Sequence, residues 1–232
     1  MTKVIAVIPA AGLGKRFGQD LKKTFYILSG KPVVAHVLEA FQKCGAVDEI
    51  IPVFKADELT EGQEILRMFN ITKAKSVVAG GKERQDSVCN ALKTITNDNA
   101  VVAIHDGARP LITQEVIGRC LSGLAECDGV IAAVPVKDTI KRHTVSGDIF
   151  FVDKTVNRSV LWSVQTPQVF VSGSIKEAYK KAFDEGFYAT DDAALLERYG
   201  GKVRIVMGSY KNIKITTAED IPLAEALLKQ CE

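Results

Sequence analysis

A loop rich in small residues follows the first apolar run of the chain. It reads Pro9-Ala10-Ala11-Gly12-Leu13-Gly14-Lys15-Arg16-Phe17-Gly18. Small side chains allow backbone N–H groups to approach a phosphate closely, and the adjacent cations Lys15 and Arg16 would neutralise its charge. The loop therefore predicts a phosphate-binding site, with an ordinary tight turn as the alternative.

Two common phosphate-binding motifs do not fit this loop. The dinucleotide motif Gly-x-Gly-x-x-Gly would need glycine where Phe17 stands, and the second strand ends at Phe54-Lys55 without an acidic residue. The nucleoside-triphosphatase loop needs four residues between its glycines and then Lys-Ser/Thr. Here five residues separate Gly12 from Gly18, and Gln19 follows. The loop by itself therefore identifies neither of these two classes, and an ordinary tight turn stays open as its alternative.

Further motifs follow in order along the chain. They are Lys22-Lys23-Thr24-Phe25, Gly30-Lys31-Pro32, Gly80-Gly81-Lys82-Glu83-Arg84-Gln85-Asp86-Ser87-Val88, His105-Asp106-Gly107-Ala108-Arg109-Pro110, Val136-Lys137-Asp138-Thr139-Ile140-Lys141, Thr166-Pro167-Gln168 and Asn212-Ile213-Lys214-Ile215-Thr216. Together with the glycine loop they resemble the 2-C-methyl-D-erythritol 4-phosphate cytidylyltransferase family, within the sugar-nucleotide pyrophosphorylase-like nucleotidyltransferases. The resemblance covers essentially the whole chain.

This resemblance implies transfer of the cytidylyl group of CTP to 2-C-methyl-D-erythritol 4-phosphate, which gives 4-diphosphocytidyl-2-C-methyl-D-erythritol and pyrophosphate in non-mevalonate isoprenoid biosynthesis. The acceptor phosphate has a second pKa of about 6, so it is largely dianionic at neutral pH and needs no general base. Catalysis would then consist of positioning and fixed cations. The alternatives are a cytidylyltransferase acting on ribitol 5-phosphate and a non-catalytic nucleotide-binding regulator.

Matching the family's motifs residue by residue gives an expected site. Arg16 and Lys23 would stabilise the transition state, and Arg158 and Lys214 would position the acceptor phosphate. The expected nucleotide-binding residues are Ala10, Ala11, Gly12, Gly14, Lys15, Gly81, Ser87 and Asp106, and the expected acceptor-binding residues are Arg109, Thr139, Arg158 and Lys214. Mg²⁺ is implied as the companion of the triphosphate, and its ligands stay undetermined, with Asp106 as one candidate.

Three of these motifs also have a purely structural interpretation. Ser87 could cap the helix that begins near it, and His105 is expected to be a buried strand-end histidine rather than a catalyst. The run Thr190-Asp191-Asp192 resembles the family's Thr-Asp-Glu, and a helix cap explains it equally well. These alternatives stay open at the level of sequence.

The order of apolar runs predicts an α/β, Rossmann-like fold with a mostly parallel central sheet flanked by helices. Strands are expected at 4–9, 49–54, 76–79, 101–105, 129–136, 203–207 and 212–215, and helices at 33–41, 88–95, 116–124, 174–185, 191–199 and 218–229. Two further strand-like runs, 139–144 and 149–155, flank a turn sequence and predict a β-hairpin. We expect one nucleotidyltransferase domain over residues 1–232, with residues 137–158 inserted as a β-arm used for dimerisation.

Composition limits the partners. Among 232 residues, 30 Lys and Arg against 28 Asp and Glu leave a net charge of +2, which favours neither nucleic acid nor an anionic membrane as partner. No apolar run reaches the length of a membrane helix, no targeting segment is evident, and the five cysteines form no Cys-x-x-Cys motif. We expect a cytoplasmic homodimer with reduced thiols whose partners are CTP and a polyol phosphate.

Replacing Lys23 with alanine should lower kcat about a hundredfold or more, the usual effect of removing one donor from a developing oxyanion. The family usually has Pro-Lys-Gln where this chain has Lys22-Lys23-Thr24, and alignment on Phe25 identifies Lys23 as the catalytic lysine. Steady-state kinetics of Lys23→Ala and Lys22→Ala tests this alignment. A severe loss for Lys22→Ala with a mild one for Lys23→Ala would show that it is wrong by one residue.

Overall fold

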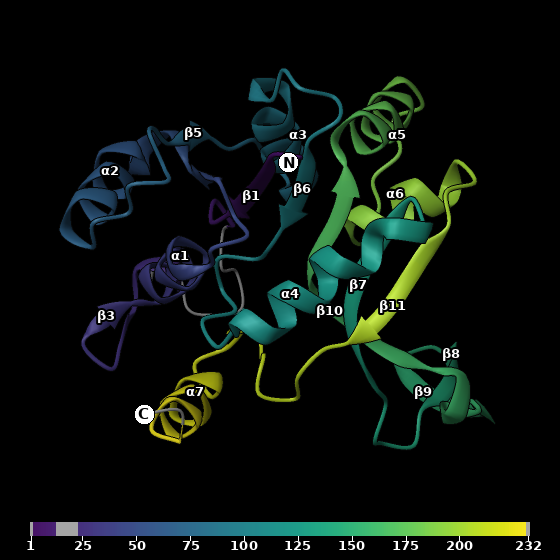
Figure 1. The fold of residues 1–232 in the computed structure, drawn as a ribbon. Helices are drawn as coiled ribbons and strands as arrows, with labels where there is room; N and C mark the ends of the chain where they lie inside the picture. Colours follow the sequence, from purple (N-terminus) through teal and green to yellow (C-terminus); the bar gives the residue numbers. More distant parts are fainter. Residues whose placement is uncertain (1, 13–22, 231–232) are drawn as a thin grey trace.

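The computed structural model describes residues 2–12 and 23–230. In this part of the chain, seven strands form one central sheet (Figure 1). In spatial order they are β11 (Val203–Met207), β7 (Gly129–Pro135), β10 (Trp162–Val171), β6 (Val101–Ile104), β1 (Val4–Pro9), β4 (Glu49–Phe54) and β5 (Val78–Ala79). All neighbouring pairs are parallel except those made by β10, which runs antiparallel to both β6 and β7. The predicted α/β fold with a mostly parallel sheet is confirmed.

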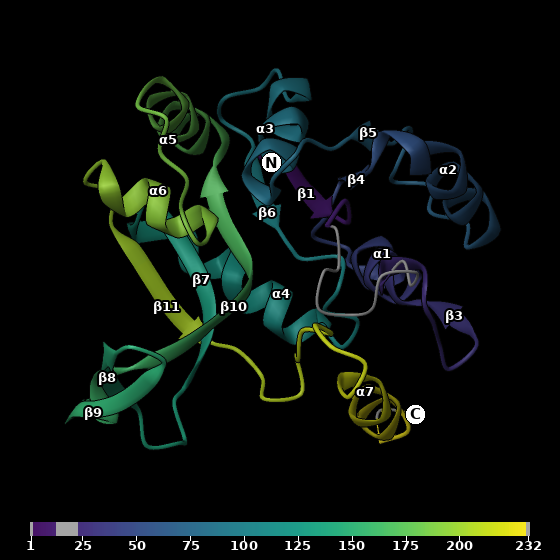
Figure 2. The same ribbon diagram turned by 180° about the vertical axis from the view of Figure 1, so that it is seen from behind.

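Helices cover both faces of this sheet. They are α1 (Val33–Lys43), α2 (Leu59–Met68), α3 (Arg84–Thr94), α4 (Gln114–Ser122), α5 (Ser172–Asp184) and α6 (Asp192–Arg198), and a further helix, α7 (Asp220–Leu228), lies beside the sheet. Along β1 the side chains alternate, so that Ala6 and Ile8 pack with α1, α2 and α4 while Ile5 and Val7 pack with α3, α5 and α6. Figures 1 and 2 show these two helical layers from opposite sides.

A small third cluster lies beside the sheet. Helix α7 packs through Ile221 and Ala224 against Leu28 and Val33, next to the short hairpin formed by β2 (Ile27–Leu28) and β3 (Lys31–Pro32). Ile215 belongs to the same cluster and is fully buried. This packing holds the chain on either side of Lys214 against the body of the protein.

Strand β10 was not predicted from the sequence. Pro167 in its middle is typical of a break, because proline cannot donate a hydrogen bond to a neighbouring strand. The structure accommodates Pro167 at an irregularity, where the pairing of β10 with β7 shifts register between Val164 and Gln168, and the Thr166–Pro167 peptide bond is cis. A ten-residue strand therefore lies in the middle of the sheet, on both sides of a proline.

Other predictions from the sequence need correction. The run 212–215 is not a strand but a loop, attached to the core by the N–H of Ile215, which donates to the carbonyl of Ala108. Strand β5 is shorter than expected, and α2 and the β2–β3 hairpin were not anticipated. Helix α3 begins earlier than expected because Glu83 and Asp86 form a capping box at its N-terminus.

The predicted hairpin is confirmed as β8 (Lys141–Ser146) and β9 (Ile149–Thr155), which pair with each other in a separate two-stranded sheet. Every residue of both strands is exposed in the single chain. Figure 1 shows the hairpin beyond the end of the sheet, away from the helical layers. No helix in the described part of the chain is long and apolar enough to span a membrane.

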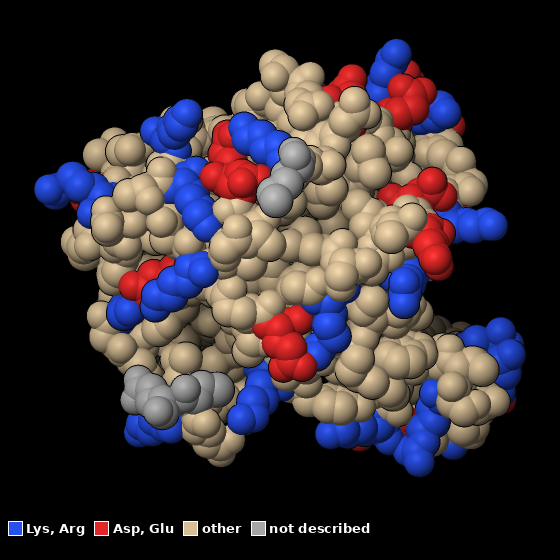
Figure 3. Space-filling view, viewed as in Figure 1, with Lys and Arg blue, Asp and Glu red and all other residues tan. Residues whose placement is uncertain are grey.

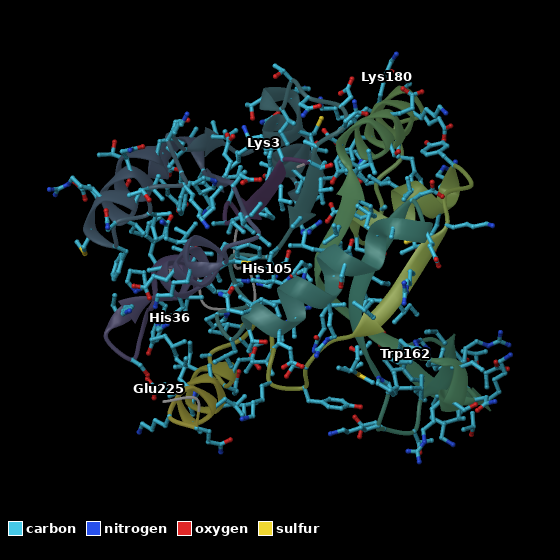
Figure 4. All side chains as sticks on the ribbon, in the orientation of Figure 1. Lys3, His36, His105, Trp162, Lys180 and Glu225 are labelled. Carbon is cyan, nitrogen blue, oxygen red and sulfur yellow. The ribbon has the colours of Figure 1, made fainter. Side chains whose placement is uncertain are left out.

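His105, directly after β6, is fully buried in the interior (Figure 4). Its ring lies 5.3 Å from that of Phe41, Nε2 lies 3.2 Å from the carbonyl oxygen of Arg109, and Nδ1 lies 3.0 Å from the hydroxyl oxygen of Thr166. Because a carbonyl only accepts, Nε2 carries the proton and the Thr166 hydroxyl donates to Nδ1. Burial lowers the pKa of His105 to about 4, so the ring is neutral and structural, as expected.

This histidine should make the fold sensitive to acid. Unfolding restores the ordinary pKa of 6.5, so the unfolded chain binds a proton that the native chain excludes between that value and about 4. The free energy of unfolding should fall by about 3 kcal/mol from this residue as the pH drops through that window. Urea unfolding of wild type and His105→Gln at pH 7 and pH 4.5 measures the difference. Glutamine can make both hydrogen bonds without titrating, so an equal loss in both proteins would contradict the assignment.

Candidate active site

A pocket of about 360 Å³ opens at the carboxyl ends of β1 and β6, the edge where open α/β sheets bind ligands. Its walls come from the loop after β1, the start of α3, the turn after β6 and the loop that follows β11. The lining residues are Pro9, Ala10, Ala11, Gly12, Lys23, Thr24, Lys82, Glu83, Arg84, Ser87, Asp106, Ala108, Lys214 and Thr216. Seven residues that the sequence predicted for the site lie here: Ala10, Ala11, Gly12, Lys23, Ser87, Asp106 and Lys214.

One wall of the pocket is formed by backbone segments in close contact. A Cβ atom on Gly80 would lie 2.5 Å from the Cβ of Ala11, and one on Gly81 would lie 2.3 Å from the Cβ of Asp86. Both distances are shorter than any side chain tolerates, so only glycine fits at these positions. The small residues therefore bring the loop after β1 against the loop before α3, with their peptide groups beside the pocket.

Ser87 ties the loop before α3 to the start of that helix but is not the helix cap, which is Glu83. The Ser87 hydroxyl donates to the carbonyl of Glu83, 3.1 Å away, and accepts from the N–H of Gly81, also at 3.1 Å. A hydroxyl oxygen has two lone pairs, so one acceptor position is left. Ser87 can therefore accept one hydrogen bond from a ligand in the pocket.

A buried carboxylate, Asp106, stands among three cations. Its Oδ2 lies 2.8 Å from Lys214 Nζ and 3.8 Å from Arg109 Nε, and its Oδ1 accepts from Arg84 Nε at 2.9 Å. Burial raises the pKa of Asp106, but the charges of Arg84, Lys214 and Arg109 outweigh it and hold the pKa well below its usual range. Asp106 is thus ionised at neutral pH.

Arg84 lies in the glycine-containing motif 80–88, but the sequence did not predict a function for it. Its two terminal nitrogens donate to Asp192, at 2.9 and 2.7 Å, and Tyr179 donates to the same carboxylate at 2.5 Å. Burial lowers the pKa of Arg84, but Asp192 and Asp106 more than offset this and hold it well above its usual value. Nothing in the sequence signals this contact, because 108 positions separate Arg84 from Asp192.

Asp191 confirms the helix-cap interpretation for the first acid of that second motif. Its side chain accepts from the N–H of Ala194 at 2.9 Å and from Gln168 Nε2 at 2.8 Å. The neighbouring Asp192 instead faces the interior and is only 1% exposed. Two adjacent acids therefore have different functions, one in the helix start and one in the ion-pair cluster.

A second hollow of about 310 Å³ adjoins the first. The two share Arg84, Asp106 and Lys214, so the ion-pair cluster forms the boundary between them. The remaining lining residues are Arg109, Val164, Gln165, Thr166, Gln168, Thr190 and Asp191. Arg109 also donates to the carbonyl of Asn212 at 2.9 Å, which ties it to the loop of Lys214. The site therefore has two compartments with a cationic boundary.

The remaining predicted residues lie elsewhere. Gly81 lies beside the first pocket, bonded to Ser87. Thr139 and Arg158 are exposed at the base of the hairpin and line neither compartment of this chain, and Arg158 donates to the carbonyl of Lys137. Gly14, Lys15, Arg16 and Lys22 lie outside the described residues.

Comparison with known proteins gives one consistent result. The family model described as "IspD: 2-C-methyl-D-erythritol 4-phosphate cytidylyltransferase" matches residues 4–230. A protein of that name from Geotalea uraniireducens is 47% identical over 230 residues, covering 98% of this chain and 97% of that protein. Another from Alkaliphilus oremlandii is 45% identical, covering 99% of this chain and 96% of that protein.

Solved structures agree with the sequence matches. The crystal structure of 4-diphosphocytidyl-2C-methyl-D-erythritol synthase from Anaerococcus prevotii superposes with a TM-score of 0.85 at 33% identity, covering 98% of this chain and 96% of that one. The corresponding cytidylyltransferase of Thermus thermophilus gives a TM-score of 0.78 at 28% identity, covering 96% of this chain and 98% of that one. With its motifs, fold and both comparisons in agreement over nearly the whole length, the chain belongs to the 2-C-methyl-D-erythritol 4-phosphate cytidylyltransferase family.

Proposed function

We propose that the chain transfers the cytidylyl group of CTP to 2-C-methyl-D-erythritol 4-phosphate, with CTP in the larger compartment and the acceptor in the adjoining one. A phosphate oxygen of the acceptor attacks the α-phosphorus of CTP, the bond from that phosphorus to the β-phosphate oxygen breaks, and pyrophosphate leaves. The observation that carries the proposal is the shared boundary, where Arg84, Asp106 and Lys214 lie between two polar hollows. That boundary is where two anionic substrates would have to meet.

Recognition of the base would use the closely packed wall. The N–H groups of Ala10 and Gly81 already donate to the Val53 carbonyl and to Ser87, so the carbonyls of these residues and the backbone of Ala11 would contact the base. The vacant acceptor position of Ser87 suits the amino group of cytosine. Since the wall consists of backbone segments held together by glycines, it cannot easily widen for a purine. The proposal therefore includes a preference for CTP over purine nucleotides.

The cations of the site supply the catalytic electrostatics. We assign Gly12, Gly14 and Lys15 to the triphosphate and Arg16 and Lys23 to the charge that develops on the α-phosphate. Of these residues, Gly12 and Lys23 line the described pocket. Lys214, at the boundary, and Arg109, in the adjoining compartment, would bind the acceptor phosphate. Fixed cations lower the barrier because they need no reorganisation as the charge develops.

Mg²⁺ fits this pocket as an ion that arrives with the triphosphate. The acids in the lining are Asp106, which is paired with Arg84 and Lys214, and Glu83, whose side chain accepts from the backbone of α3. No group of three or more His, Cys, Asp or Glu residues that could hold a metal ion occurs in the described chain. Magnesium commonly keeps waters and binds through phosphates and one or two carboxylates. It would neutralise the triphosphate here, with Asp106 as the candidate protein ligand.

The compartment in which the enzyme works is also a proposal. The four described cysteines, Cys44, Cys89, Cys120 and Cys127, are free thiols. Free thiols are typical of reducing compartments. This supports a cytoplasmic location.

The reaction itself gives the first test. The purified chain with CTP, Mg²⁺ and 2-C-methyl-D-erythritol 4-phosphate should release pyrophosphate, and omission of Mg²⁺ or chelation with EDTA should abolish the release. Ribitol 5-phosphate as acceptor, and ATP or GTP as donor, should be about tenfold poorer or worse in kcat/KM. Equal turnover of ribitol 5-phosphate would overturn the acceptor assignment, and binding of CTP without turnover of any acceptor would favour a regulator.

We further propose a homodimer in which the arm, residues 137–158, completes the partner's site, while residues 1–232 form one nucleotidyltransferase domain. The arm exposes large apolar side chains, with Phe150 69%, Phe151 54% and Val152 65% exposed. A two-stranded hairpin is only marginally stable in water, and exposed apolar patches of this kind are typical of interfaces. Figure 3 shows Lys and Arg side chains gathered on the same arm, at the lower right.

Sharing of sites would explain where Thr139 and Arg158 lie. Both residues match acceptor-binding positions of the family, yet both are exposed outside the compartments of their own chain. An arm that crosses to a second copy would bring them to that copy's acceptor compartment. The alternative is that the arm folds back onto its own chain.

Subunit mixing separates these two arrangements. Arg16→Ala and Arg158→Ala chains should each be inactive, because each lacks a cation that the reaction needs. When exchanged into mixed dimers, shared sites would produce one doubly altered site and one site with both cations, so roughly half of the mixed dimers' normal activity should return, one of two sites being intact. Mixed dimers that are verified by mass spectrometry and stay inactive would contradict the shared site.

A further inference from the structure

Asp192 is a buried acid that lines neither compartment, yet it is joined to both. It is 1% exposed and receives three hydrogen bonds, two from Arg84 and one from Tyr179. Arg84 lines both compartments and reaches Asp106 with its remaining nitrogen, Nε, at 2.9 Å. A continuous ion-pair chain therefore leads from a residue in the interior to the reacting end of the site.

The geometry of these ion pairs leaves the Arg84 guanidinium no freedom to turn. A guanidinium group is a planar fork with donors in fixed directions, and here both terminal nitrogens are bound to one carboxylate while Nε is bound to another. Burial of Asp192 without this partner would leave a charge uncompensated. Arg84 is thus held in place by Asp192, which is buried and lines neither compartment.

Lys214 is the last member of this series of ion pairs, at the end opposite Asp192, and it has two possible partners. In the structure its Nζ lies 2.8 Å from Asp106, and its side chain is 38% exposed. If Lys214 moves to an acceptor phosphate, Asp106 loses its nearest cation but keeps Arg84. Arg84 can then hold Asp106 in place and ionised while Lys214 changes partner.

We propose that Asp192 and Arg84 are positioning residues for the transfer reaction: Asp192 fixes Arg84, and Arg84 fixes Asp106, against which Lys214 is aligned for the acceptor phosphate. This inference rests on the proposed function. Without Asp192, Arg84 is a mobile cation at the boundary, where it competes with Lys214 for Asp106 and for the phosphates. The ion-pair chain thus keeps one cation static so that another can move.

The test compares Asp192→Asn with a matched control, Glu58→Gln. Glu58 is also a buried acid, 2% exposed, and lies 3.6 Å from the Lys55 ammonium, but it lines neither compartment. Both variants replace a buried carboxylate by an amide, and thermal melting confirms that each is folded at the assay temperature. Asp192→Asn should lower kcat/KM for 2-C-methyl-D-erythritol 4-phosphate about tenfold or more, whereas Glu58→Gln should keep it within about twofold.

A double-mutant cycle then separates positioning from general damage. In a Lys214→Gln background, Asp192→Asn should lower the same kcat/KM by only about twofold, because its effect passes through Lys214. Effects that multiply independently would overturn the proposal, as would an Asp192→Asn enzyme with wild-type kinetics. If Asp192→Asn does not fold, Arg84→Lys replaces it, since a single ammonium cannot bridge both acids and should cause a similar loss. A wild-type chain that transfers no cytidylyl group would instead refute the proposed function and this inference with it.

Discussion

The carboxylate of Asp106 is held charged and in place at the edge of the sheet by the cations around it. A buried negative charge is costly unless cations compensate it, and three cations approach Asp106 from three different segments of the chain. Arg84 comes from the start of α3, Arg109 from the turn after β6 and Lys214 from the loop after β11. Much of the local structure serves to bring these segments to one point at the edge of the sheet.

The irregular middle of β10 is the physical support of this arrangement. Thr166 accepts from the N–H of Asp106 at 3.1 Å and donates to His105, which fixes the turn after β6. Gln165 bonds to both the carbonyl and the N–H of Ser209, and Asn212 donates to the carbonyl of Thr166 at 2.9 Å, so the loop that carries Lys214 is tied to the same segment.

Gln168 extends this support to the other side of the site. Its amide donates to Asp191 at 2.8 Å and accepts from the N–H of Ala193 at 2.9 Å, on either side of Asp192. A regular strand would direct alternate side chains to opposite faces of the sheet. The register shift lets neighbouring residues of one strand hold both the Lys214 loop and the start of α6.

From the sequence alone, continuous apolar runs predicted most of the parallel strands, because these strands are buried on both faces. Apolar residues at helical spacing predicted most of the helices. The resemblance of the motifs to the family likewise predicted that Ala10, Lys23, Ser87, Asp106 and Lys214 belong to one site, and the pocket contains them all. Strand β10 was not predicted because proline is typical of a strand break, and the strands that pair with β10 on either side of Pro167 come from distant parts of the chain.

The pairing of Arg84 with Asp192 required the tertiary structure, since 108 positions separate the two residues and no local pattern couples them. A sequence shows which residues can carry charge. Which charges meet is decided only when the packing of strands and helices removes water from between particular pairs of side chains, because electrostatic interactions become strong and selective only at short range in a buried environment.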